Sequence, residues 1–193
     1  MKTRLLCIFG LLFLMMIPAN AKTKQGEGLK SAIIQYEMMT NGNAISMTQY
    51  SDDYGNQLCM KMFMMGIEVA TITRNDTVYV LNYAQKSGVK YVRPETDINY
   101  NALTPELIAK YKIEAQGIEE VLGKKCTKYT ARIVNEDTPV EVITWVYKGV
   151  VLKSVAEYGG DKRVEMVATS LEENPEVSEE TFMVPSDFVI RAM

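Results

Sequence analysis

Short apolar runs that alternate with turn-forming residues extend along most of this 193-residue chain. The runs are rich in Val, Ile, Thr, Tyr and Met and end at Gly, Asn or Asp, a pattern typical of antiparallel strands joined by tight turns. Ten runs are predicted to be strands: residues 31–39, 45–51, 58–65, 67–74, 77–83, 89–93, 125–134, 140–147, 150–158 and 163–171. We therefore predict a mainly β protein, with a large curved antiparallel sheet that forms an unclosed barrel.

The segment between the two groups of runs has a different pattern. Residues 104–106 (Thr-Pro-Glu) combine a capping residue, a proline at the first helical position and an early acid, which indicates a helix start. We expect a short helix over 104–112, packed on the concave side of the sheet, with a buried side made by Leu107, Ile108 and Tyr111. The remaining expectations are a connection through 118–122 back to the sheet and a final edge strand that ends at 184–185.

The first 21 residues have the organisation of a signal peptide. Lys2 and Arg4 precede an apolar run over 5–17, and small residues follow at 19–21. The apolar run is too short to span a bilayer as a helix, which takes about 20 residues. We expect cleavage near Ala21, which leaves residues 22–193 as one domain in the periplasm or outside the cell, without a membrane span.

Composition excludes several classes of function. The chain contains no His, so it cannot form a Ser-His or Cys-His catalytic pair or a His-ligated metal site. A formal net charge of −3 argues against a nucleic-acid-binding protein, which needs clustered Lys and Arg. We therefore expect a protein that is not an enzyme and needs no cofactor.

Two cysteines, Cys59 and Cys126, remain after the expected cleavage. An even number of cysteines in an exported protein is compatible with a disulfide. Each one alternates with Lys or Gln along its predicted strand, which places it on the more polar face. A disulfide and two free thiols are both compatible with the sequence, because sequence does not give the distance between the two strands.

One predicted strand has an unusual number of methionines. The two-residue period of a strand places Leu58, Met60, Met62 and Met64 on one face. Such a face is commonly ordinary core, but flexible thioether side chains also suit a surface that adapts to apolar ligands. Thioethers could also bind Cu(I), although no His accompanies them. Together with Met38 and Met47 in neighbouring strands, these side chains are the candidate ligand-binding residues.

Four segments in order along the chain resemble one known family: residues 48–55, 123–129, 144–153 and 182–188. They are similar to the periplasmic lipoprotein-carrier superfamily, the LolA/LolB-like fold, and within it to an uncharacterised family of exported bacterial proteins. The resemblance implies an unclosed barrel whose helices cover an apolar cavity for acyl chains. It also implies an envelope lipoprotein as a further candidate partner.

The sequence thus favours a non-enzymatic periplasmic binding protein that holds an acyl chain, a lipid or another apolar molecule in an open barrel. The alternative is a structural or protein-interaction domain of the cell envelope, whose barrel is filled by its own side chains and binds no ligand.

Overall fold

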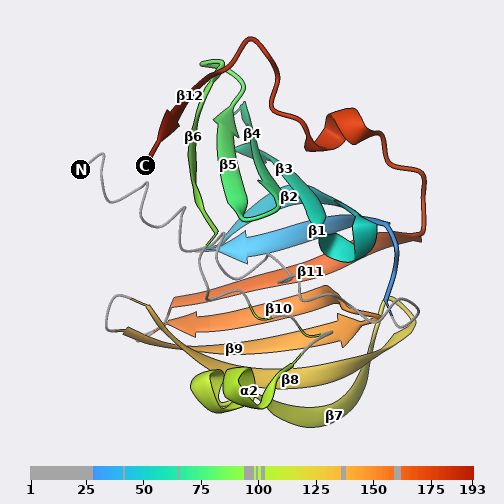
Figure 1. Cartoon of the computed structure of the whole chain (residues 1–193). Coiled ribbons are helices and arrows are strands. Elements are labelled where there is room, and N and C mark those ends of the chain that lie inside the picture. The colour runs from blue at the N-terminus through green and yellow to red at the C-terminus, as the bar shows by residue number, and fades with distance from the viewer. Residues whose placement is uncertain are drawn as a thin grey trace.

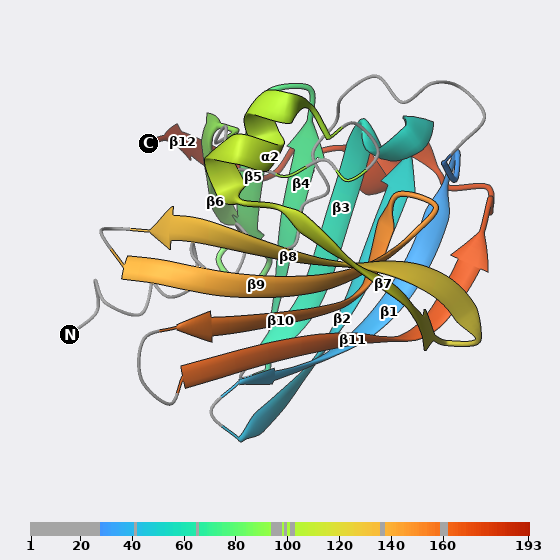
Figure 2. The ribbon, with the colours of Figure 1, turned by 90° about the horizontal axis from the view of Figure 1, so that it is seen from below.

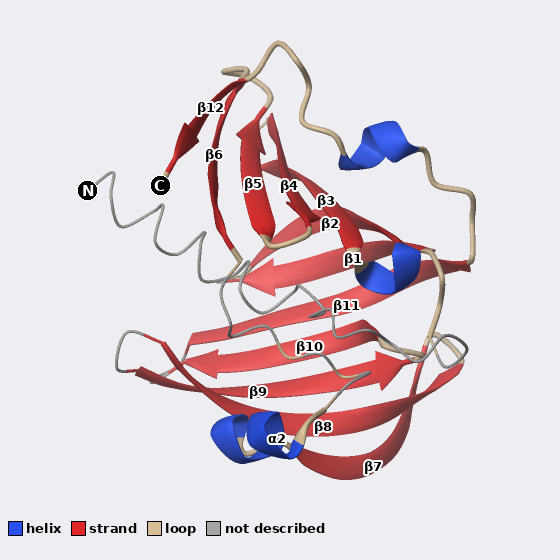
Figure 3. Cartoon of the chain, in the orientation of Figure 1, coloured by secondary structure: helices blue, strands red, loops and turns tan. Residues whose placement is uncertain are grey.

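The computed structural model describes residues 28–40, 42–64, 66–93, 98, 100, 103–135, 138–158 and 162–193, and the expected signal peptide lies outside them. The described chain is built mainly from strands (Figure 1). They are β1 (Ala32–Thr40), β2 (Asn43–Asp52), β3 (Gln57–Met64), β4 (Ile67–Arg74), β5 (Thr77–Asn82), β6 (Ser87–Val92), β7 (Glu114–Val121), β8 (Lys124–Asn135), β9 (Thr138–Tyr147), β10 (Val150–Tyr158), β11 (Lys162–Glu173) and β12 (Val189–Ala192). The helical elements are α2 (Pro105–Tyr111) and the 3-10 turns η1 (Asp53–Gly55) and η2 (Glu179–Phe182), shown in blue in Figure 3.

The twelve strands of the described chain belong to one sheet, in the order β12-β6-β5-β4-β3-β2-β1-β11-β10-β9-β8-β7. Two antiparallel meanders, β1–β6 and β7–β11, are joined by the pairing of β1 with β11. The sheet curves but does not close, because β12 and β7 lie at its two edges (Figure 2). The predicted fold class is confirmed, and each of the ten predicted strands is present.

Two strands occur where the sequence analysis expected none. The segment expected to be a connection is the edge strand β7, in which every residue except Val121 is exposed. At the C-terminus, the expectation of an edge strand that ends at 184–185 is wrong. This region instead contains η2, followed by β12, which pairs in parallel with β6. Neither strand has the apolar alternation that marked the others.

The register defines the two faces of the sheet. Ile34, Gln49, Met60, Thr71 and Val80 are directly opposite one another on β1 to β5, so they lie on one face, which we call the inner face. A second row continues this face across the other meander, through Met38, Met166, Ser154, Thr144 and Tyr129.

The helix α2 covers part of the inner face, as expected. The hydroxyl oxygen of Thr104 caps it by accepting from the Leu107 N–H at 3.3 Å. Tyr111 at its end is buried with Ile113 against the inner-face residues of β8 and β9. Ile108, which was expected on the buried side, is 41% exposed, because α2 has only two turns and contacts the sheet along one narrow side.

The outer face of β3, β4 and β5 is covered by residues 174–193, which we call the C-terminal strap (Figure 1). Phe182 of η2 is buried there in a cluster whose other buried members are Cys59, Ala70, Ile72 and Leu81. Phe188 of the strap packs edge-on against Tyr83, with ring centroids 5.0 Å apart. The strap gives this sheet a second apolar core on the side opposite the inner face.

Cys59 and Cys126 are free thiols and fully buried. The expectation that they lie on a more polar face is wrong for Cys59, because Phe182 covers it, and for Cys126, which is buried in the apolar cluster that includes Trp145. Burial raises the pKa of the Cys59 thiol to about 11. Five strands of the sheet separate β3, which carries Cys59, from β8, which carries Cys126. Of the two alternatives that the sequence left open, the structure has two free thiols rather than a disulfide.

Candidate ligand-binding face

The methionines singled out in the sequence meet on the inner face. Met38, Met47, Met60 and Met62 are buried in one apolar cluster that spans β1, β2 and β3. Met166 on β11 belongs to the same cluster and lies directly opposite Met38. Met166 was not among the predicted ligand-binding residues, because the pairing of β1 with β11 joins residues far apart in the chain.

The two remaining candidates lie at the ends of the row on β3. Leu58 is buried at the start of the strand, although it is not part of the methionine cluster. Met64 is half-buried at the end of the strand, and its partner Ile67 across the β3–β4 turn is 36% exposed. The inner face of β3 therefore becomes more accessible to solvent toward this turn.

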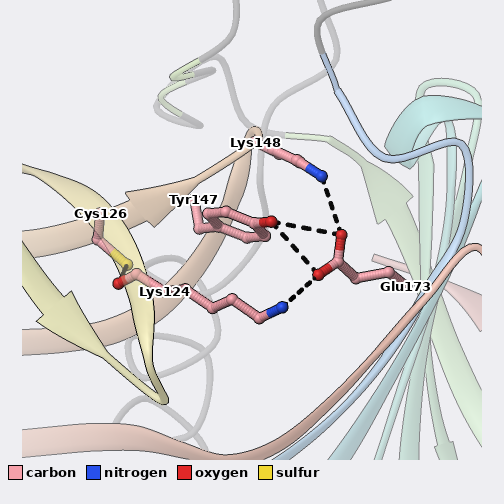
Figure 4. Close-up of polar contacts among 5 residues, drawn as sticks. All are labelled: Lys124, Cys126, Tyr147, Lys148 and Glu173. Carbon is pink, nitrogen blue, oxygen red and sulfur yellow. Dashed lines mark hydrogen bonds and ion pairs between the residues drawn. The ribbon is translucent and has the colours of Figure 1, made fainter.

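A cluster of charged side chains lies at the opposite end of the inner face from the β3–β4 turn, near the start of β1. Figure 4 shows this cluster. Glu173, at the end of β11, pairs with Ala32 at the start of β1. Its carboxylate lies 2.6 Å from Nζ of Lys124 and 3.0 Å from Nζ of Lys148, and it accepts a hydrogen bond from the Tyr147 hydroxyl at 3.3 Å. The two lysines lower the pKa of Glu173 to about 2. This cluster connects β8, the β9–β10 turn and β11.

Buried polar side chains also occur on the inner face, next to the methionines. Gln49 and Ser51 lie on β2, and Thr71 and Thr73 lie on β4, all of them at most 5% exposed. The Ser51 hydroxyl donates a 3.4 Å hydrogen bond to the Ala32 carbonyl. Oγ1 of Thr71 has no hydrogen-bond partner in the described part of the chain. These polar residues were not predicted as site residues, because a Thr-rich strand is ordinary in composition.

The described residues contain no helix that is both long and apolar enough to cross a membrane. Nor does this part of the chain contain a group of three or more Cys, Asp and Glu side chains arranged to hold a metal ion.

The chain matches no known family model and no curated protein sequence. It is similar in structure to an uncharacterized conserved protein from Thermus thermophilus, with a TM-score of 0.60 and 9% identity over 86% of this chain and 93% of the other. It is also similar to a chain of the Pseudomonas aeruginosa MucA/MucB complex, with a TM-score of 0.52 and 13% identity over 81% of this chain. This chain spans 56% of that longer protein. The curved unclosed sheet of this chain is a LolA/LolB-like fold.

Proposed function

We propose that this protein is a non-enzymatic periplasmic binding protein that holds an acyl chain or a similar apolar molecule on its inner face. Leu58, Met60, Met62 and Met64 of β3 would contact the ligand, with Met38 and Met47 beside them. The observation that carries the proposal is the cluster of buried methionines shared by β1, β2, β3 and β11 on the inner face. The LolA/LolB-like fold supports it, because the resemblance seen in the sequence implies a cavity for acyl chains.

The contrast between the two cores also supports this proposal. The core under the C-terminal strap is built from Ala70, Ile72, Leu81 and Phe182, the usual side chains of a permanently filled interior. The inner-face cluster instead includes five buried methionines, at positions 38, 47, 60, 62 and 166, and unbranched methionine side chains rearrange at low cost around ligands of different shape. The methionines therefore make this part of the inner face more adaptable than the core under the strap.

The test is lipid uptake by residues 22–193 purified from the periplasm. We expect native mass spectrometry to show copurified lipid, and titration with a fluorescent fatty acid to give saturable binding. Met64→Glu should remain folded, because Met64 is only half-buried, and should bind at least about tenfold more weakly, because a charge next to the acyl chain must be desolvated.

Phe63→Glu is the matched control. Phe63 is adjacent in sequence, points to the outer face and is 63% exposed, so its replacement should leave both folding and uptake unchanged. Uptake by the Met64→Glu variant at the wild-type level would remove this end of β3 from the site.

A structural or protein-interaction domain is the second candidate function. It is favoured by the deep burial of Met60 and Met62 and by the fold likeness to a protein solved in a MucA/MucB complex. A lipid-free native mass together with no fatty-acid uptake would favour this function over the first.

A further inference from the structure

We propose that the inner face recognises an acyl lipid through the carbonyl oxygen of its ester or amide linkage, and that the Thr71 hydroxyl donates the hydrogen bond. This inference rests on the proposed function and makes it more specific, because it names a polar atom of the ligand and the residue that binds it. A plain hydrocarbon lacks that atom.

The first observation is a boundary between polar and apolar side chains that falls at the same level on two strands. On β2, the inner-face residues change from Ser51 and Gln49 to Met47. On β4, they change from Thr73 and Thr71 to Val69.

The register shows that these two changes coincide. Gln49 and Thr71 both lie opposite Met60, whereas Met47 and Val69 both lie opposite Met62. Residues two apart on a strand are separated by roughly 7 Å. On β2 and β4 the inner face therefore changes from polar to apolar between two adjacent rows, whereas β3 between them carries Met60 and Met62. An ester or amide is the corresponding junction in an acyl lipid, where the polar part meets the hydrocarbon chain.

The second observation is the unpaired hydroxyl of Thr71. Thr71 is 2% exposed, and its Oγ1 has no hydrogen-bond partner among the described residues. Met60 on one side and Val80 on the other offer no strong acceptor. A buried hydroxyl without a partner is unfavourable, and Thr71 lies on the face of the sheet that is proposed to bind the ligand. A carbonyl oxygen at this level would accept its proton.

Thr144 on β9 is the second buried hydroxyl without a hydrogen bond of good geometry in the described chain. Burial raises the pKa of the Tyr100 phenol to about 12, and the nearby hydroxyl of Thr144 partly offsets this rise. Of these two hydroxyls, only that of Thr71 lies at the polar–apolar boundary, so Thr71 is the residue assigned to the ligand.

The outer face of β4 packs without hydroxyl groups from this strand. Ala70 and Ile72, which alternate with Thr71, are buried against Phe182 in a wholly apolar cluster. Valine has nearly the shape of threonine and would fill the space at position 71 without an unpaired polar atom. Packing alone therefore does not require a hydroxyl at position 71, and an acceptor atom on a ligand would give this hydroxyl its partner.

The experiment compares two probes that differ only at the junction: a pyrene-labelled fatty acid methyl ester and the pyrene-labelled alkane of equal length. Wild-type protein should bind the ester more tightly. Thr71→Val should weaken binding of the ester about 3- to 10-fold, the effect of one neutral hydrogen bond, and leave binding of the alkane unchanged. The melting temperature of the ligand-free variant should stay equal or rise, because the unpaired hydroxyl is gone.

Two further variants serve as controls. Thr71→Ser keeps the hydroxyl and should keep the preference for the ester. Thr48→Val removes a hydroxyl from the outer face of β2, opposite Lys61, and should change neither affinity.

The outcomes separate this inference from the proposed function. If wild-type protein binds neither probe, the proposed function fails. If it binds both, but Thr71→Val leaves the ester affinity unchanged or weakens both probes equally, lipid binding stands and the role of Thr71 is overturned.

Discussion

Phe182 shows how much a single residue contributes to this sheet. It is 2% exposed and covers the outer face of β3 and β4, although it comes from a 3-10 turn of four residues. Phe182→Ala should leave a cavity and lower the free energy of unfolding by about 3–5 kcal/mol. Urea unfolding measures this change. The reactivity of Cys59 with a thiol reagent should rise as well, because Phe182 shields it.

Met183→Ala is the matched control for that prediction. Met183 follows Phe182 directly but is 44% exposed, so its truncation should change stability by no more than about 0.5 kcal/mol. Equal stability losses in the two variants would mean that the strap does not seal the outer face through Phe182.

The burial of Cys59 could not be predicted from its neighbours in the sequence. Its neighbours Gln57 and Lys61 indicated a solvent-facing side of the strand, and Lys61 does remain partly exposed. The residue that buries Cys59 lies more than a hundred positions later in the chain. Strand periodicity predicts which residues share a face, but it does not predict that a distant segment returns to cover that face.

At the level of secondary-structure elements, β12 depends on a glycine in its partner strand. A Cβ atom at Gly88 of β6 would lie 2.6 Å from the Val80 carbonyl oxygen and 2.8 Å from Cδ2 of Leu81. It would also lie 3.1 Å from Cδ1 of Ile190, which belongs to β12. Gly88 therefore lets β12 and the end of the strap approach the sheet closely.

Gly88→Ala should displace β12 and lower the free energy of unfolding by about 1–3 kcal/mol, because backbone atoms of β5 block the added methyl group. Hydrogen exchange should become faster at residues 189–192. Ser87→Ala, one position earlier, is the control with little expected effect. Unchanged exchange in the Gly88→Ala variant would show that the sheet accommodates the methyl group without loosening β12.

The elements that sequence predicted correctly are those with a clear apolar period. The ten predicted strands alternate or are continuously apolar, because at least one of their faces is buried or, in β6, half-buried. β7 escaped prediction because it is an edge strand with exposed side chains on both faces, including Glu119 and Glu120. β12 has only four residues, and its pairing with β6 is set by the path of the strap.

The candidate site was predictable to a similar extent. The two-residue period of β3 was enough to place Leu58, Met60, Met62 and Met64 on one face. The polar residues opposite Met60 could not be assigned to this face, because their position depends on the register between strands. That the methionines bind a ligand stays a prediction.

At the scale of the whole molecule, the Glu173 cluster should make stability depend on acid pH. The folded-state pKa of Glu173 is about 2, below the ordinary value of 4.5. A carboxyl group with a lowered pKa stabilises the fold above pH 4.5, and this contribution disappears as the pH falls from 4.5 toward 2. Glu173→Gln should therefore be less stable than wild type at pH 7 by about 1 kcal/mol, since water screens this partly exposed cluster.

Urea unfolding at pH 7, 5 and 3 tests this prediction. The difference between wild type and Glu173→Gln should be constant from pH 7 to 5 and shrink by pH 3. A double variant with Lys124→Gln and Lys148→Gln should lose the same pH dependence, because it removes both cations from the carboxylate. A difference that stays constant down to pH 3 would show that Glu173 acts through packing rather than charge.

The central position of β1 in the sheet has a consequence during synthesis of the protein on the ribosome. Its partner on one side, β11, is made long after it, and the Ser31 hydroxyl bonds a carbonyl 144 residues further along the chain. At the usual 5–20 residues per second, a ribosome needs roughly 7 to 30 seconds to add that stretch. During this interval β1 is the open edge of an incomplete sheet, so the nascent first meander is the species that most needs a chaperone to prevent pairing with other chains.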